Sequence, residues 1–262
     1  MSIINIEEAK KIFNEYVSHY NMEDEKIKLK VKHTYQVLNR SRDVAVSLNF
    51  SEEEKELAML IGLLHDIGRF EQVKLHNTFD DTVFPHSKYG IKILFGENHI
   101  RDYIKDDKYD KVIYNAIKYH SDFKLDEEKL DEKSLLHAKL IRDADKLDIF
   151  RVILEENMKA ISTISKEQLE KDYITDIVYN DLMECKGILR SKRHTSIDVI
   201  ASFIGFIYDI NYKFSFEYVL ENNFIEKIIN NIEFINDETM KKLLNIKKVA
   251  EKYLRNKIKS SV

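Results

Sequence analysis

The sequence is poor in cysteine, glycine and proline, and each shortage excludes a class of fold. Cys185 is the single cysteine in 262 residues, so the chain forms no internal disulfide and we expect a reducing, cytoplasmic compartment. Six glycines and one proline argue against a sheet-rich fold with many tight turns. No run approaches the roughly 18 apolar residues of a membrane span, and MSIINIEEAKK lacks a signal-peptide pattern, so we expect no membrane partner.

The residues that are present favour helices. With 44% hydrophobic residues the chain can bury a sizeable core, and a net charge of −4 gives no strong nucleic-acid signal. Residues 7–20 show the clearest helical stripe, made by Ala9, Ile12, Phe13, Tyr16, Val17 and Tyr20. We therefore predict an all-α, compact multi-helix fold. We expect a single domain over residues 1–262, with a core at about 23–155 and a C-terminal helical extension at about 156–262.

Helical periodicity also sets the expected order of elements. We predict helices over residues 7–20, 23–48, 52–66, 88–95, 109–120, the run LLHAKLIRDADKLDIF, 149–161, 166–183, 196–210, 215–235 and 238–257. Ser51 is the expected N-cap of the third helix. Residues 71–85 follow neither period and hold Pro85, so we expect a loop long enough to cover a site.

Several polar side chains fall on the apolar faces of these helices. His33 shares a stripe with Leu29 and Val37, and Asp145 shares one with Ala138 and Ile141. With Asp66, which adjoins His65, and His86, at the end of the expected loop, they make a set of six candidate ligands: His33, His65, Asp66, His86, His120 and Asp145. One buried histidine alone is more often structural, but imidazoles and carboxylates together suit divalent transition metals, which remove the cost of burying them. Six ligands exceed the needs of one ion with an open position, so two ions sharing Asp66 fit better.

The ordered set resembles the HD superfamily of metal-dependent phosphohydrolases. The resemblance rests on LLHDIGRF, HSKYG, AIKYHSD and IRDADKLD, and it covers roughly residues 30–150. It implies that His33, His65, Asp66 and Asp145 form the core metal set. His86 and His120 match the extra histidines of members that bind two metals, and Asp66 would bridge the ions. The implied cofactors are two divalent transition-metal ions (Fe, Mn, Ni, Co or Zn, with Mg acceptable).

The resemblance also implies a reaction. Two ions lower the pKa of water, supply hydroxide near neutral pH and offset phosphoryl charge, so no serine or cysteine nucleophile is needed. We assign catalytic roles to Asp66 and Arg69, and phosphate contacts to Arg69, Lys88 and Lys146. Arg69 could equally form an ordinary surface ion pair, and for Lys88 and Lys146 the ordinary ion pair is the favoured interpretation. The expected partner is a small-molecule phosphoester of nucleotide or cyclic-nucleotide type, and the many helices leave room for a homodimer face.

Two alternatives stay open at this point. The same six ligands occur in the mixed-valent di-iron oxygenases of the superfamily, and a non-catalytic nucleotide-binding module would also keep the fold. The HD-GYP cyclic-dinucleotide phosphodiesterases commonly read H-D-I-G-K and carry a G-Y-P signature. This sequence has Arg69 after Gly68 and no G-Y-P, which disfavours a cyclic dinucleotide as substrate.

Overall fold

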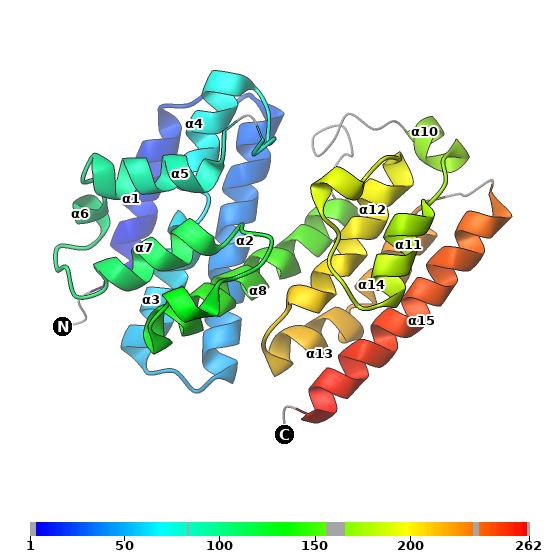
Figure 1. Cartoon of the computed structure of the whole chain (residues 1–262). Helices are drawn as coiled ribbons and strands as arrows, with labels where there is room; N and C mark the ends of the chain where they lie inside the picture. Colours follow the sequence, from blue (N-terminus) through cyan, green and yellow to red (C-terminus); the bar gives the residue numbers. More distant parts are fainter. Residues whose placement is uncertain (1–3, 83, 156–165, 233–235, 261–262) are drawn as a thin grey trace. The chain divides into compact units, whose positions relative to one another are not determined.

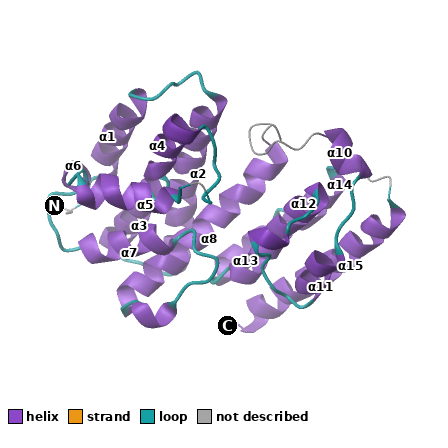
Figure 2. Cartoon of the chain, turned by 45° about the horizontal axis from the view of Figure 1, so that its top comes forward, coloured by secondary structure: helices purple, strands orange, loops and turns teal. Residues whose placement is uncertain are grey.

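The structure is a computed structural model that describes residues 4–82, 84–155, 166–232 and 236–260. Within these residues every regular element is a helix and no strand occurs, which confirms the all-α prediction (Figure 2). None of the described helices combines the length and the apolar composition that crossing a bilayer requires.

The chain forms two compact units, Met1–Asp148 and Ile149–Val262. The helix α8 (Glu132–Glu155) contains the boundary between them (Figure 1). Whether the two units act as the single domain expected from the sequence stays a prediction.

The first three helices of the first unit begin at side-chain caps. The side chains of Asn5, Asp24 and Ser51 accept hydrogen bonds from backbone N–H groups in the first turns of α1, α2 and α3, which satisfies donors without a helical partner. The elements are α1 (Ile6–Ser18), α2 (Glu25–Ser47), α3 (Glu52–Leu64), α4 (Ile67–His76), α5 (His86–Ile91), the π-turn η1 (Lys92–Gly96), α6 (Ile100–Tyr103), α7 (Asp110–Tyr119), η2 (Glu127–Lys129) and α8.

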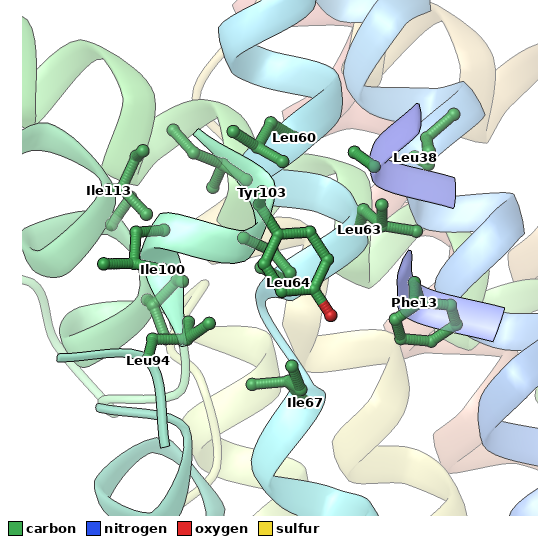
Figure 3. Packing of buried hydrophobic residues seen from close by; sticks show 14 of the residues in the cluster. Phe13, Leu38, Leu60, Leu63, Leu64, Ile67, Leu94, Ile100, Tyr103 and Ile113 are labelled. Atoms are coloured by element: carbon green, nitrogen blue, oxygen red, sulfur yellow. The ribbon is translucent and has the colours of Figure 1, made fainter. Parts of the chain in front are cut away.

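The core of this unit surrounds α3, whose leucines and isoleucine are buried on nearly every side. Leu60, Leu63 and Leu64 meet Phe13 of α1 and Leu38 of α2 (Figure 3). On the other side, Ile100, Tyr103 and Ile113 close the cluster. A helix that is hydrophobic all round must be covered by others, so α3 fixes the positions of its neighbours. The polar residues at its C-terminal end are thereby held in a rigid frame.

The prediction of a loop over residues 71–85 is wrong for residues 71–76, which are helical. α4 continues to His76 and buries Phe70 and Val73, and it ends where Asn77 takes the left-handed conformation at φ 52°. The loop is therefore 77–85. The next helix begins at His86 with Pro85 as its N-cap, two residues earlier than the sequence indicated.

In the second unit the predicted helices 166–183, 196–210 and 215–235 are each divided into shorter elements, whereas the last helix extends beyond its predicted range of 238–257. The elements of this unit are α10 (Lys166–Lys171), α11 (Asp176–Met183), η3 (Arg190–Lys192), α12 (Ser196–Ile204), η4 (Gly205–Asp209), α13 (Lys213–Glu221), α14 (Phe224–Asn230) and α15 (Asp237–Ser260). The predicted helix 166–183 is interrupted because Asp172 and Thr175 hydrogen-bond to residues of α12. The predicted helix 215–235 is broken at Asn223, which is left-handed, and residues 156–161 and 233–235 of the predictions lie outside the described residues.

Candidate metal centre

All six residues predicted as metal ligands lie in the first unit, and the structure brings them together. They come from α2 (His33), the junction of α3 and α4 (His65 and Asp66), the start of α5 (His86), the end of α7 (His120) and α8 (Asp145). Asp66 is the N-cap residue of α4, but its carboxylate makes no capping bond. It is aimed at the histidines instead.

One group of ligands faces the Oδ2 atom of Asp66. That oxygen lies 3.6 Å from Nε2 of His33 and 3.6 Å from Nε2 of His65. Oδ1 of Asp145 lies 3.1 Å from the same His33 nitrogen and 3.8 Å from that of His65. His33, His65 and Asp66 are close enough together to hold a single ion, and the Asp145 carboxylate lies beside the two imidazoles. We name these four side chains the first group.

A second group faces the other oxygen of the same carboxylate. Oδ1 of Asp66 lies 3.1 Å from Nε2 of His86 and 3.8 Å from Nε2 of His120. The two imidazole nitrogens are 2.8 Å apart. Asp66, His86 and His120 form the second group, so Asp66 is shared and lies between the two.

The Nδ1 atoms of all four histidines point away from the centre and bind an oxygen. His33 bonds to Asp148 at 2.7 Å and His86 to Asp81 at 2.7 Å. His65 and His120 bond to the carbonyl oxygens of the residues three positions earlier, at 2.8 and 2.7 Å. Carbonyl and carboxylate oxygens only accept, so Nδ1 carries the proton in each ring and the Nε2 lone pair faces inward.

This arrangement of lone pairs fits a divalent cation. Nε2 of His33 and of His65 are buried and make no hydrogen bond within the described residues, and the facing Nε2 atoms of His86 and His120 are both acceptors. Four acceptor nitrogens and two carboxylates directed at one another repel unless a cation lies between them. Imidazole and carboxylate donors with an outer ring of hydrogen bonds are typical of a transition-metal site.

Burial and neighbouring charge set the protonation of these groups. Burial lowers the pKa of His65 to about 3, so this ring is neutral at ordinary pH. Burial would raise the pKa of Asp66, but the Lys30 ammonium and the neighbouring imidazoles hold it well below the usual range. Burial and Lys30 would lower the pKa of His33, but the neighbouring carboxylates of Asp145 and Asp148 raise it.

Lys30 is the cation in closest contact with the centre. Its Nζ donates to Oδ2 of Asp66 at 2.7 Å and lies 5.3 Å from the ring centre of Phe79. Lys30 is one turn before His33 on α2, and this spacing of three residues is the signal that could have identified it.

The three cations predicted to contact phosphate lie in different settings. The Arg69 guanidinium binds both oxygens of Asp81, at 2.9 and 3.1 Å, and the backbone oxygen of Phe79, while its Nε lies 3.5 Å from Oδ1 of Asp66. Lys146 is buried and donates to the carbonyl oxygen of Arg142. Lys88 is exposed on α5. Their roles as phosphate contacts stay predictions.

The described residues of the loop, 77–82 and 84–85, are anchored beside the second group. Gln72, fully buried on α4, donates to Asp81 and to the backbone oxygen of Phe84. The Phe84 ring packs on Tyr89 with ring centres 3.8 Å apart. The predicted cover over the site is therefore a short, anchored loop.

Sequence reasoning missed the residues that hold the histidines. Asp148 had a signal, since it is one turn after Asp145 on α8 and faces the same way. Asp81 had no such sequence signal, because it lies in an irregular loop. Only the folded conformation of that loop brings its carboxylate to His86.

Comparison with protein families agrees with this geometry. The HD domain family model matches residues 31–149, which contain all six residues of the two groups. This part of the chain is therefore similar to an HD domain, and the HD superfamily consists mostly of metal-dependent hydrolases. Searches of curated proteins and of solved structures return no match for the chain.

Proposed function

We propose that the HD domain of this chain hydrolyses a phosphoester, most simply a nucleotide, with the help of two divalent metal ions. The observation that carries the proposal is the shared carboxylate of Asp66, whose two oxygens face separate groups of inward-pointing imidazoles. One carboxylate between two ligand groups is the arrangement by which protein sites hold two ions close together.

The chain's own residues would hold the ions and orient the substrate. His33, His65 and Asp145 belong to one ion, and His86 and His120 to the other. When bound, such a pair supplies Lewis acidity that lowers the pKa of water and offsets negative charge on a phosphoryl group. The buried imidazoles, each fixed through Nδ1, keep their Nε2 atoms in place without reorganisation.

Lys30 is the residue best placed to contact the phosphoryl group. Its ammonium is next to the shared carboxylate and has three donors, of which the bond to Asp66 uses one. Arg69 is held by Asp81, so its part is to support the loop. The ring of Phe79, near both cations, offers an aromatic surface on which a base could stack.

The test uses the full chain purified without chelator. Its metal content is measured by plasma mass spectrometry, and hydrolysis is measured with bis(p-nitrophenyl) phosphate, p-nitrophenyl phosphate and a panel of nucleotides. We expect close to two transition-metal ions per chain and metal-dependent release of phosphate or alcohol. The Asp66→Asn variant should lose both metal and turnover and keep its helical circular dichroism, while Asp122→Asn, an exposed carboxylate after α7, should keep all three.

Other results would favour the alternatives. Iron-dependent consumption of dioxygen without phosphoester hydrolysis would indicate the di-iron oxygenase. Tight nucleotide binding without turnover in the metal-loaded protein would indicate a binding module. Full hydrolysis by the Asp66→Asn variant would overturn the proposed site altogether.

A further inference from the structure

We propose that two carboxylates outside the ligand set, Asp81 and Asp148, each hold one half of the metal centre, so that the two ions can be removed separately. The inference deepens the proposed function, on which it depends for the presence of the ions. Both Asp81 and Asp148 are positioning residues, and binding of the second ion depends on Asp81.

Each group contains one histidine held by a carboxylate and one held by a backbone carbonyl. In the first group Asp148 holds His33 and the Gly62 carbonyl holds His65. In the second group Asp81 holds His86 and the Ile117 carbonyl holds His120. A carboxylate bound to Nδ1 fixes the ring orientation and raises the basicity of the Nε2 ligand atom, more so than a neutral carbonyl. The two carboxylates therefore act on different ions.

Several hydrogen bonds fix the Asp81 carboxylate beside the second group. Its Oδ1 atom accepts from His86 twice, from the backbone N at 3.2 Å and from Nδ1 at 2.7 Å. The same oxygen accepts from Arg69 at 2.9 Å and from Gln72 at 3.1 Å, both on α4. Arg69 and Gln72 thus hold Asp81, and Asp81 holds the start of α5, where His86 lies. None of these bonds involves the first group.

Asp148 occupies the corresponding place in the first group. It is buried, and it is one helical turn from Asp145 on α8. The two carboxylates face opposite nitrogens of the His33 ring. Asp145 lies beside Nε2, and Asp148 lies beside Nδ1. Asp148 binds Nδ1 of His33, whereas Asp81 binds His86, Arg69 and Gln72, so we expect these bonds of Asp81 to persist when Asp148 is replaced.

The experiment counts ions and does not depend on activity. Chelator-treated full chain is titrated with Mn²⁺ by calorimetry, and the loaded protein is examined by electron paramagnetic resonance, which distinguishes a coupled pair from a single Mn²⁺. The variants are Asp81→Asn and Asp148→Asn, which keep shape and remove charge. Asp80→Asn is the matched control, because Asp80 accepts from Thr82 within the same loop.

We expect two ions and a coupled signal in the wild type and in Asp80→Asn. Asp81→Asn should bind one ion with unchanged affinity and the other roughly 10- to 100-fold more weakly, with the six-line spectrum of an isolated Mn²⁺. Asp148→Asn should weaken one ion to a similar degree. The double variant should weaken both, which shows that the two single variants affect different ions.

Two results overturn the inference while the proposed function stands. In one, both single variants bind two ions as tightly as the wild type. In the other, either single variant loses both ions together, so that the halves are not separable. If the wild type itself binds no ion, both the metal centre and this inference fail. Circular dichroism of each variant shows whether a loss of binding reflects loss of the fold.

Discussion

The ammonium nitrogen of Lys30 lies 2.7 Å from Oδ2 of Asp66, and both side chains are largely buried. A buried carboxylate shared by four imidazoles receives its nearest positive charge from this lysine. The Phe79 ring lies over the ammonium and limits its access to solvent. A lysine in this place can attract a second anion, and a phosphoryl group at the centre would be that anion.

Replacing Lys30 with Gln should lower kcat/KM for the phosphoester about 10- to 100-fold, because a hydrogen bond to a charged group contributes roughly 1.5–3 kcal/mol. Metal content, measured by plasma mass spectrometry, should stay at the wild-type value. The matched control is Lys28→Gln on the same helix, where the exposed ammonium pairs with Glu23 and Glu25. Lys30→Arg should recover part of the rate, and equal kinetics in Lys30→Gln and the wild type would remove Lys30 from the mechanism.

Substituting Ala for Gly68 should destabilise the first unit by roughly 1–3 kcal/mol or more, since an added Cβ overpacks a backbone contact. That Cβ would overlap the carbonyl oxygen of His86 and lie 2.5 Å from the amide nitrogen of Gly90. Chemical denaturation measures the loss. The control is Gly96→Ala, where the nearest atom is 3.7 Å away, on the flexible Lys92 side chain. Similar stability of the two variants would contradict the close approach of α4 and α5.

His137 should make the metal-free protein less stable in mild acid. Burial lowers the pKa of this fully buried ring to about 4, and neither nitrogen has a hydrogen-bond partner in the described part of the chain. Above a pH of about 6.5 the ring is neutral in both states. As pH falls from about 6.5 toward 4, the unfolded chain binds a proton that the folded protein does not, so stability is lost.

The variant His137→Leu isolates this effect. The difference in unfolding free energy between wild type and variant should change by roughly 2–3 kcal/mol in the variant's favour between pH 7 and pH 4.5. Chelator in every sample keeps acid release of metal out of the comparison. Parallel stability curves for the two proteins would show that His137 takes up its proton in the folded state.

Removal of metal should lower the melting temperature. An ion that binds only the folded state stabilises it by about 2.7 kcal/mol when its free concentration is 100 times Kd, which corresponds to a shift on the order of 5–10 °C. Differential scanning calorimetry of the full chain with Mn²⁺ and with chelator measures this shift. In Asp66→Ala the two curves should coincide, because the carboxylate shared by both groups is missing. A metal-dependent shift that persists in this variant would place the ions elsewhere.

The helices that the sequence predicted best are those with a strong apolar stripe. α1, α2, α3 and α7 lie within two residues of the predicted ranges. The prediction failed for the second half of α4, where Val73 is the one buried apolar residue of a largely polar segment and packing against the core, more than the pattern, stabilises the helix. It failed again at residues 172–175, where partners from α12 compete with helix formation.

The sequence determines the order and chemical types of His33, His65, Asp66, His86, His120 and Asp145, and the set together, more than any one buried histidine, indicates a metal site. Tertiary structure decides that Nε2 of His33 faces the centre and that Lys30 reaches the shared carboxylate, since both depend on partners far along the chain, whereas the Nδ1 partners of His65 and His120 are backbone carbonyls three residues earlier. Asp148 is 115 positions from His33, and Lys30 is 36 positions from Asp66. Local periodicity describes one helix at a time, whereas these contacts arise only when helices pack.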